Sequence, residues 1–175
     1  MSESTRTGPA AGASAARPAR RGPGRARAWF ALAVTLLALA AHGNVVGNDF
    51  AGDAVPWVRA NPLLHGLSSP RGIITSPYRT DVAPAHSPWR PLTALTHALS
   101  WSAGGGTAAP YHAFDVALHA LVTLLVFGLL GVLGAAPVVA AAGAALFAVH
   151  PVHVEAIASI VGRADLLVAV FSLVA

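Results

Sequence analysis

The stretch 113–149 limits the possible folds most, because Asp115 is its only charged residue. As one helix these residues would extend ~55 Å, nearly twice the ~30 Å hydrocarbon core of a bilayer. Pro137 interrupts the stretch, and proline starts or ends a helix more readily than it continues one. The sequence therefore predicts two membrane helices, at 112–133 and 138–160, joined by a tight cytoplasmic turn.

The rest of the chain also fits an integral membrane protein. Charged residues make up 10% of the sequence, well below the roughly 25% of a soluble domain. Residues 29–46 form another apolar run that is about long enough to cross a bilayer. Residues 166–175 begin a fourth helix that needs further sequence to span, so the chain is expected to be truncated. The fold class expected is an all-α integral membrane protein.

The residues before the first apolar run indicate its orientation. Residues 1–28 hold six of the eleven basic residues and no periodic apolar pattern, which is typical of a disordered tail. An arginine cluster directly before an apolar run keeps the N-terminus in the cytoplasm. A cleaved signal peptide is the alternative, because small residues occur at Ala40 and Ala41. This basic tail does not indicate nucleic-acid binding. Arginine without lysine, beside abundant alanine and glycine, indicates a GC-rich bacterial genome and hence the bacterial inner membrane.

Residues 47–111 differ from the apolar runs on either side. They contain most of the prolines, three of the four tryptophans and both tyrosines. Charges scattered through this segment exclude a membrane span. After one crossing from the cytoplasm, the segment is expected to form a long extracytoplasmic loop. Loops of this length are uncommon unless they are functional.

Three polar residues follow one face of the helix predicted at 112–133. His112, Asp115 and His119 are spaced by three and four residues, so their side chains share a face. Polar residues at membrane depth normally face the bundle interior or a water-filled cavity. Three interpretations remain open: hydrogen bonds to neighbouring helices, a functional polar cavity, or a metal or haem site.

The sequence HPVHVE, starting at His150, predicts a bend near the extracytoplasmic surface. Pro151 interrupts backbone hydrogen bonding, which at membrane depth is tolerated only against protein or a water-filled cavity. His150 and His153 share roughly one face, while Glu155 points elsewhere. Two histidines could ligate zinc only with a third ligand from another part of the chain. The sequence GRAD at 162–165 is expected to form an exposed turn into the fourth helix.

Four motifs, in this order, resemble the transmembrane and tetratricopeptide-repeat-containing O-mannosyltransferases, whose membrane region also occurs in bacterial repeat proteins. They are NDFAGDAVPWVRANP (48–62), WRPLTALTHAL (89–99), YHAFDVALHALVTLLVF (111–127) and LFAVHPVHVEAIASIVGRADLL (146–167). The first is similar to the family's Asn-Gly-Phe-x-x-Asp-Asp motif followed by Asn-Pro. In the second and third, Trp89 and Asp115 stand where the family commonly has tyrosine and asparagine.

The resemblance implies a GT-C glycosyltransferase, a multi-helix membrane enzyme with a long first extracytoplasmic loop. Such an enzyme transfers a sugar, here mannose, from a polyprenyl-phosphate carrier to serine or threonine hydroxyls of a protein acceptor. An acid of the first loop acts as catalytic base, and Asp53 falls on the first acid of the family's pair. Ala54 occupies the second position, while Asp49 adds a carboxylate nearby. No other cofactor is implied, and a divalent metal stays an open question.

The departing polyprenyl phosphate gains negative charge, which a guanidinium can stabilise through two hydrogen bonds. Arg90 and Arg163 are the candidates, since each lies in a family-like motif. His150, His153 and Glu155, in the last motif, are further candidates for substrate binding. The structural alternative for both arginines is an interfacial anchor or an ion pair, such as Arg163 with Asp165.

Two other classes of function compete with the enzyme. A catalytically degenerate scaffold would bind protein partners through C-terminal helical repeats, and Ala54 favours this reading. A transporter or haem protein would use the buried histidines instead. Repeats of 34 residues after further membrane spans would support the family.

Overall fold

The computed structural model describes residues 23–79 and 82–175, and all regular elements in that part are helical. The α-helices are α1 (Pro23–His42), α2 (Pro70–Thr75), α3 (Pro91–Gly104), α4 (Ala109–Val132), α5 (Pro137–Val149), α6 (Val154–Ala158) and α7 (Arg163–Val174). Two segments, Gly24–Gly47 and Ala109–Val132, are long and apolar enough to cross a membrane. The expected all-α integral membrane class is therefore confirmed.

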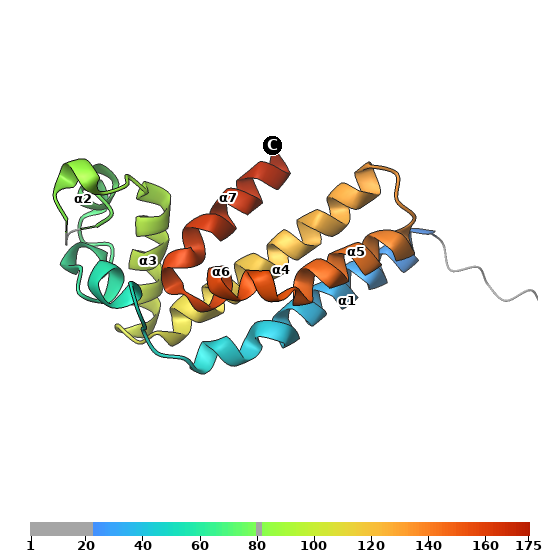
Figure 1. Cartoon of the computed structure of the whole chain (residues 1–175), viewed down its shortest axis with the longest axis horizontal. Helices are drawn as coiled ribbons and strands as arrows, with labels where there is room; N and C mark the ends of the chain where they lie inside the picture. Colours follow the sequence, from blue (N-terminus) through green and yellow to red (C-terminus); the bar gives the residue numbers. More distant parts are fainter. Residues whose placement is uncertain (1–22, 80–81) are drawn as a thin grey trace, which may run out of the picture.

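Helices α1, α4 and α5 pack against one another, and α7 packs on α4 (Figure 1). Their contact includes a cluster of alanines, Ala38, Ala120 and Ala148, each at most 4% exposed. Small residues let membrane helices approach closely, so their backbones can make dispersion contacts that bulky side chains would prevent. Further along the bundle, Val34 and Phe127 pack with alanines of α5.

The start of α1 and the α4–α5 turn lie at one end of this bundle, and α2 and α3 lie at the other (Figure 1). Arg27 near the start of α1 contacts the far end of α4, with its guanidinium 5.8 Å from the Phe127 ring centroid. One end of the bundle is therefore closed by a short turn, and the other carries the folded segment that contains α2 and α3.

The first helix differs from its prediction at both ends. It was expected at 29–46, but α1 begins at Pro23 and ends at His42, and a 3₁₀ turn, Gly43–Gly47, follows. Proline suits the first turn of a helix, where its missing N–H would have no partner. The helix therefore starts within the expected disordered tail, of which residues 1–22 lie outside the described part.

The helix predicted at 138–160 is not one continuous element, and the bend predicted at HPVHVE is present. Helix α5 ends at Val149, His150 has extended backbone, and the axis bends by 48° before α6. Pro151 lacks the N–H that would continue the helix, which explains the break. The fourth helix starts at Arg163, three residues earlier than predicted.

The segment expected as a long loop folds into a compact lobe. It contains α2 and the 14-residue helix α3, which packs on α4 and α7. Its core is formed by buried apolar side chains from several turns: Phe50, Ala54, Val58, Leu64, Ile73, Tyr78, Ala94 and Ala98. The lobe therefore has a core of its own, which fixes the positions of its surface residues at one end of the membrane bundle.

Candidate functional site

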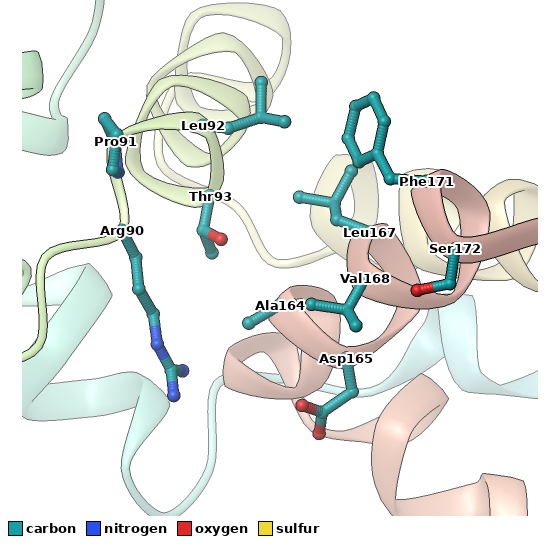
Figure 2. A pocket seen from close by; sticks show the side chains of 10 residues that line it. All are labelled: Arg90, Pro91, Leu92, Thr93, Ala164, Asp165, Leu167, Val168, Phe171 and Ser172. Carbon is teal, nitrogen blue, oxygen red and sulfur yellow. The ribbon is translucent and has the colours of Figure 1, made fainter. Parts of the chain in front are cut away.

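Two adjoining cavities lie where the lobe meets α6 and α7. The polar cavity, of about 190 Å³, is lined by Trp57, Arg90, Glu155 and Asp165 together with Ala156, Ser159, Val161 and Gly162. The apolar cavity, of about 380 Å³, lies between α3 and α7 (Figure 2). Most of its lining is aliphatic or aromatic, including Leu92, Leu167, Val168 and Phe171. Arg90 and Asp165 line both cavities, so a charged region adjoins an apolar one.

Arg90 owes its position to the start of α3. It is the residue before Pro91, where the backbone is not yet helical, with φ −136° and ψ 65°. Proline disfavours helical backbone in the residue before it, so α3 begins after Arg90 and the side chain stays exposed. Within the described part of the chain Arg90 makes no ion pair. Its guanidinium is thus available to an anionic ligand.

Two carboxylates lie across the polar cavity from different helices. Glu155 is in the first turn of α6 and Asp165 in the first turn of α7, and both are exposed. Negative charge is favoured at a helix N-terminus, which supports Asp165 in that place. In this small space the guanidinium can bind a phosphate, and the two carboxylates can accept hydrogen bonds from hydroxyl groups.

Asp53 lies on an exposed turn just before the π-helical turn Val55–Arg59. Its carbonyl oxygen accepts a hydrogen bond of 3.1 Å from the N–H of Trp57, which lines the polar cavity. Asp53 itself lines neither cavity. Ala54, at the second position of the acidic pair, is 1% exposed and packs in the lobe core. A carboxylate there would be buried, so alanine suits this packing.

Asp49 belongs to a different place. Its Oδ1 accepts a hydrogen bond of 2.7 Å from the N–H of Phe50, and it lines a third cavity of about 580 Å³. Arg59 and Thr107 also line that cavity, which shares no residue with the polar one. Of the two carboxylates of the first motif, Asp49 therefore lines the third cavity and Asp53 does not.

Arg163 was predicted to lie in an exposed turn, but it is fully buried. Its Nε donates to Oδ1 of Asp115 at 2.6 Å. Its two Nη groups donate to Oγ of Ser100 at 3.0 Å and to the carbonyl oxygen of Tyr111 at 2.9 Å. One guanidinium thereby joins α3, α4 and α7.

This arrangement corrects two expectations for Arg163. It lines neither cavity, so the predicted phosphate contact does not fit its position. The alternative ion pair with Asp165 is also wrong, because the partner is Asp115. The arginine acts as an internal cross-link between helices.

The three residues of the polar face of α4 are all buried. His112, Asp115 and His119 are each at most 1% exposed. Asp115 binds Arg163 through Oδ1, while its Oδ2 has no hydrogen-bond partner among residues 23–79 and 82–175. In the part of the chain that the structure describes, no three histidines or acids are arranged to hold a metal ion. The face lies against α7 at Asp115 and against α5 at His119.

The helix break at Pro151 explains the hydrogen bonds that the nearby histidine side chains make. His150 Nδ1 accepts a hydrogen bond from the N–H of Val152, which in a continuous helix would bind the carbonyl of Ala148. That carbonyl instead accepts hydrogen bonds of 3.1 Å from Nε2–H of both His42 and His119. A backbone group freed at membrane depth is thus satisfied by side chains.

His153 packs on the Phe147 ring, with centroids 4.2 Å apart, and neither it nor His150 lines the polar cavity. Of the three candidates from the last motif, the structure brings only Glu155 to that cavity. Sequence reasoning missed Trp57 and the residues behind it, Tyr78 and His97. One signal was available, since His97 and Ser100 lie three apart on α3 and both are buried.

The curated proteins that are similar to the chain include the following three. Protein O-mannosyl-transferase Tmtc1 of Drosophila melanogaster is 46% identical over 82 residues, which is 47% of this chain and 10% of the relative. Protein O-mannosyl-transferase F38B6.6 of Caenorhabditis elegans is 30% identical over 145 residues, 79% of this chain and 21% of the relative. Protein O-mannosyl-transferase TMTC1 of Homo sapiens is 33% identical over 161 residues, 89% of this chain and 18% of the relative.

No family model matches the chain. No solved structure matches it either. The chain spans about a fifth or less of the length of the three relatives.

Proposed function

The chain belongs to the family of these protein O-mannosyl-transferases, and from that premise we propose that it forms the donor-binding part of a membrane glycosyltransferase. The enzyme transfers mannose from a polyprenyl-phosphate carrier to serine or threonine hydroxyls of a protein acceptor. The transfer takes place on the extracytoplasmic side of the membrane. For a bacterial chain that membrane is the inner one.

One observation carries the proposal: a guanidinium with no ion pair among the described residues stands where a polar cavity meets an apolar one. A polyprenyl-phosphate sugar has the same division, with a long apolar chain, one phosphate and a polyhydroxyl head. The apolar cavity between α3 and α7 suits the chain, and Arg90 suits the phosphate (Figure 2). Glu155 and Asp165 then face the sugar hydroxyls. Asp53, close in sequence to Trp57, supplies the base for the acceptor hydroxyl.

Replacing Arg90 by alanine is expected to weaken binding of farnesyl phosphate by about 10-fold, because a charge-assisted hydrogen bond to the phosphate is lost. Binding of the neutral alcohol farnesol should stay unchanged, since the apolar cavity is intact. The measurement is a titration of both lipids against purified protein in detergent. Arg71→Ala is the matched control, because Arg71 is an exposed arginine of α2 outside both cavities. Equal effects of the two variants would show general surface charge instead of a phosphate site.

The proposal also requires the lobe to be extracytoplasmic. The chain has no cysteine, so a single introduced cysteine reports its own accessibility. In intact cells Ser69→Cys, in the lobe, is expected to react with a membrane-impermeant maleimide. Ala136→Cys, in the α4–α5 turn, should react only after permeabilisation. The reverse pattern would place the lobe in the cytoplasm and remove it from the side where we propose the transfer.

A catalytically degenerate scaffold is the second candidate, favoured by the buried Ala54 where the family motif has an acid. This protein would keep the fold and bind protein partners without transferring sugar. A wild-type protein that binds farnesyl phosphate and farnesol equally and transfers no sugar would favour the scaffold.

A further inference from the structure

Tyr78 is a buried side chain that no motif singled out, and it lies directly behind the polar cavity. We propose that Tyr78 is a positioning residue, which, held by His97, sets the Arg90 guanidinium and the Trp57 indole at the polar cavity. The inference rests on the proposed function, because it assigns a role through the phosphate-binding arginine.

The contacts of Tyr78 converge on the two cavity residues. Its ring is 2% exposed, and the guanidinium carbon of Arg90 lies 5.9 Å from the ring centroid. Its centroid is 6.5 Å from that of Trp57, with the two ring planes at 77°. Arg90 and Trp57 both line the polar cavity. One ring thus contacts a cation on one side and an indole on another, behind the space where a ligand would bind.

Two hydrogen bonds fix Tyr78. Its hydroxyl shares a hydrogen bond of 3.0 Å with Nε2 of His97, which is fully buried on α3. Its backbone N–H donates to the carbonyl of Pro88 at 3.0 Å, two residues before Arg90. The side chain is therefore tied to the helix that Arg90 starts, and the backbone to the segment that leads into it.

Charge supports this role for the pair. Burial lowers the pKa of His97, and the nearby Arg163 lowers it further, so the imidazole stays neutral. Burial raises the pKa of Tyr78, so the phenol stays protonated. A neutral hydrogen bond between them keeps the ring in place without adding a charge that would compete with the ligand for Arg90.

An exposed arginine has many rotamers, and ordering it on binding costs conformational entropy. A cation held over an aromatic face has fewer accessible rotamers, so less is lost when the phosphate binds. This gives Tyr78 an effect on phosphate affinity although it does not line the cavity itself.

The test is a double-mutant cycle on the purified protein, with farnesyl phosphate as ligand and farnesol as its neutral counterpart. Tyr78→Leu should weaken farnesyl phosphate binding by about 2- to 5-fold, the range of an exposed cation–π contact. In the Arg90→Ala background the same change should have no further effect. Farnesol binding should stay unchanged throughout. A purely structural role for Tyr78 predicts instead that the losses multiply and that farnesol binding falls as well.

If Tyr78→Leu does not fold, Tyr78→Phe replaces it in the same cycle. It keeps the ring but loses the hydrogen bond to His97, so a smaller loss that again depends on Arg90 is expected. An unchanged affinity in Tyr78→Phe, or a loss independent of Arg90, overturns the positioning role alone. A wild-type protein that does not prefer farnesyl phosphate to farnesol overturns the proposed function, and the inference with it.

Discussion

Arg163→Met is expected to destabilise the protein by about 3–5 kcal/mol, because it leaves the carboxylate of Asp115 buried without its partner. Both side chains are fully buried, and their ion pair is 2.6 Å long. Ser100 and the carbonyl of Tyr111 lose a hydrogen-bond donor at the same time. The measurement is unfolding of the purified protein in mixed micelles of increasing SDS content.

Two further variants separate the cost of leaving Asp115 without a partner from the cost of removing the bulk of the arginine side chain. Arg163→Met combined with Asp115→Leu removes both charges and should recover much of the stability, since paired apolar residues replace buried ion pairs well. Arg163→Lys keeps the charge, but its three N–H donors are on one nitrogen and cannot reach all three acceptors as the planar guanidinium does, so an intermediate loss is expected. If Arg163→Met unfolds like the wild type, the cross-link between α4 and α7 contributes nothing to stability.

Asp53→Asn is expected to reduce sugar transfer by ~10²–10⁴-fold, the usual contribution of a general base. Asparagine keeps the shape of the side chain but cannot take up the proton of the serine or threonine hydroxyl. Binding of farnesyl phosphate should stay at the wild-type level, because Asp53 does not line the cavities assigned to the donor. The assay is transfer of mannose from farnesyl-phosphoryl mannose to a serine- and threonine-containing peptide.

Asp49→Asn is the matched control, since it removes the other carboxylate of the first motif. It lines the third cavity with Arg59 and should leave transfer largely intact. If Asp49→Asn abolishes transfer and Asp53→Asn does not, the base is Asp49 and the acceptor lies in the third cavity. Equal activity of both variants and the wild type would exclude a base from this motif.

The membrane class followed from the sequence because it depends on local composition. The stretch 113–149, whose only charge is Asp115, is too apolar to be exposed to water. A run of 20 or more apolar residues forms a helix in lipid whatever surrounds it. One helix start was readable, since Pro137 occupies the first position of α5. Pro70 and Pro91 occupy the same position in α2 and α3, but both helices lie in the segment expected as a loop. The bend at Pro151 was readable because proline interrupts a helix, but the sequence did not show that it divides 138–160 into α5, α6 and the short turn between them.

The burial of a polar face on α4 was likewise accessible from spacing alone. His112, Asp115 and His119 recur at helical intervals, and a polar face in lipid must turn toward protein. Their partners were not accessible. Arg163 lies 48 residues from Asp115, and its neighbour Asp165 offered a closer but wrong partner in the sequence.

Only the tertiary structure decided which polar residues meet. The packing of α7 on α4 buries Arg163 and leaves Asp165 exposed two residues later, because these positions lie on different faces of one helix. The folding of the lobe brings Tyr78 behind Arg90 and joins it to His97, 19 residues away. Spacing rules reach only three or four residues along a helix. Contacts between helices depend on how whole faces pack, and that is set by the fit of many side chains at once.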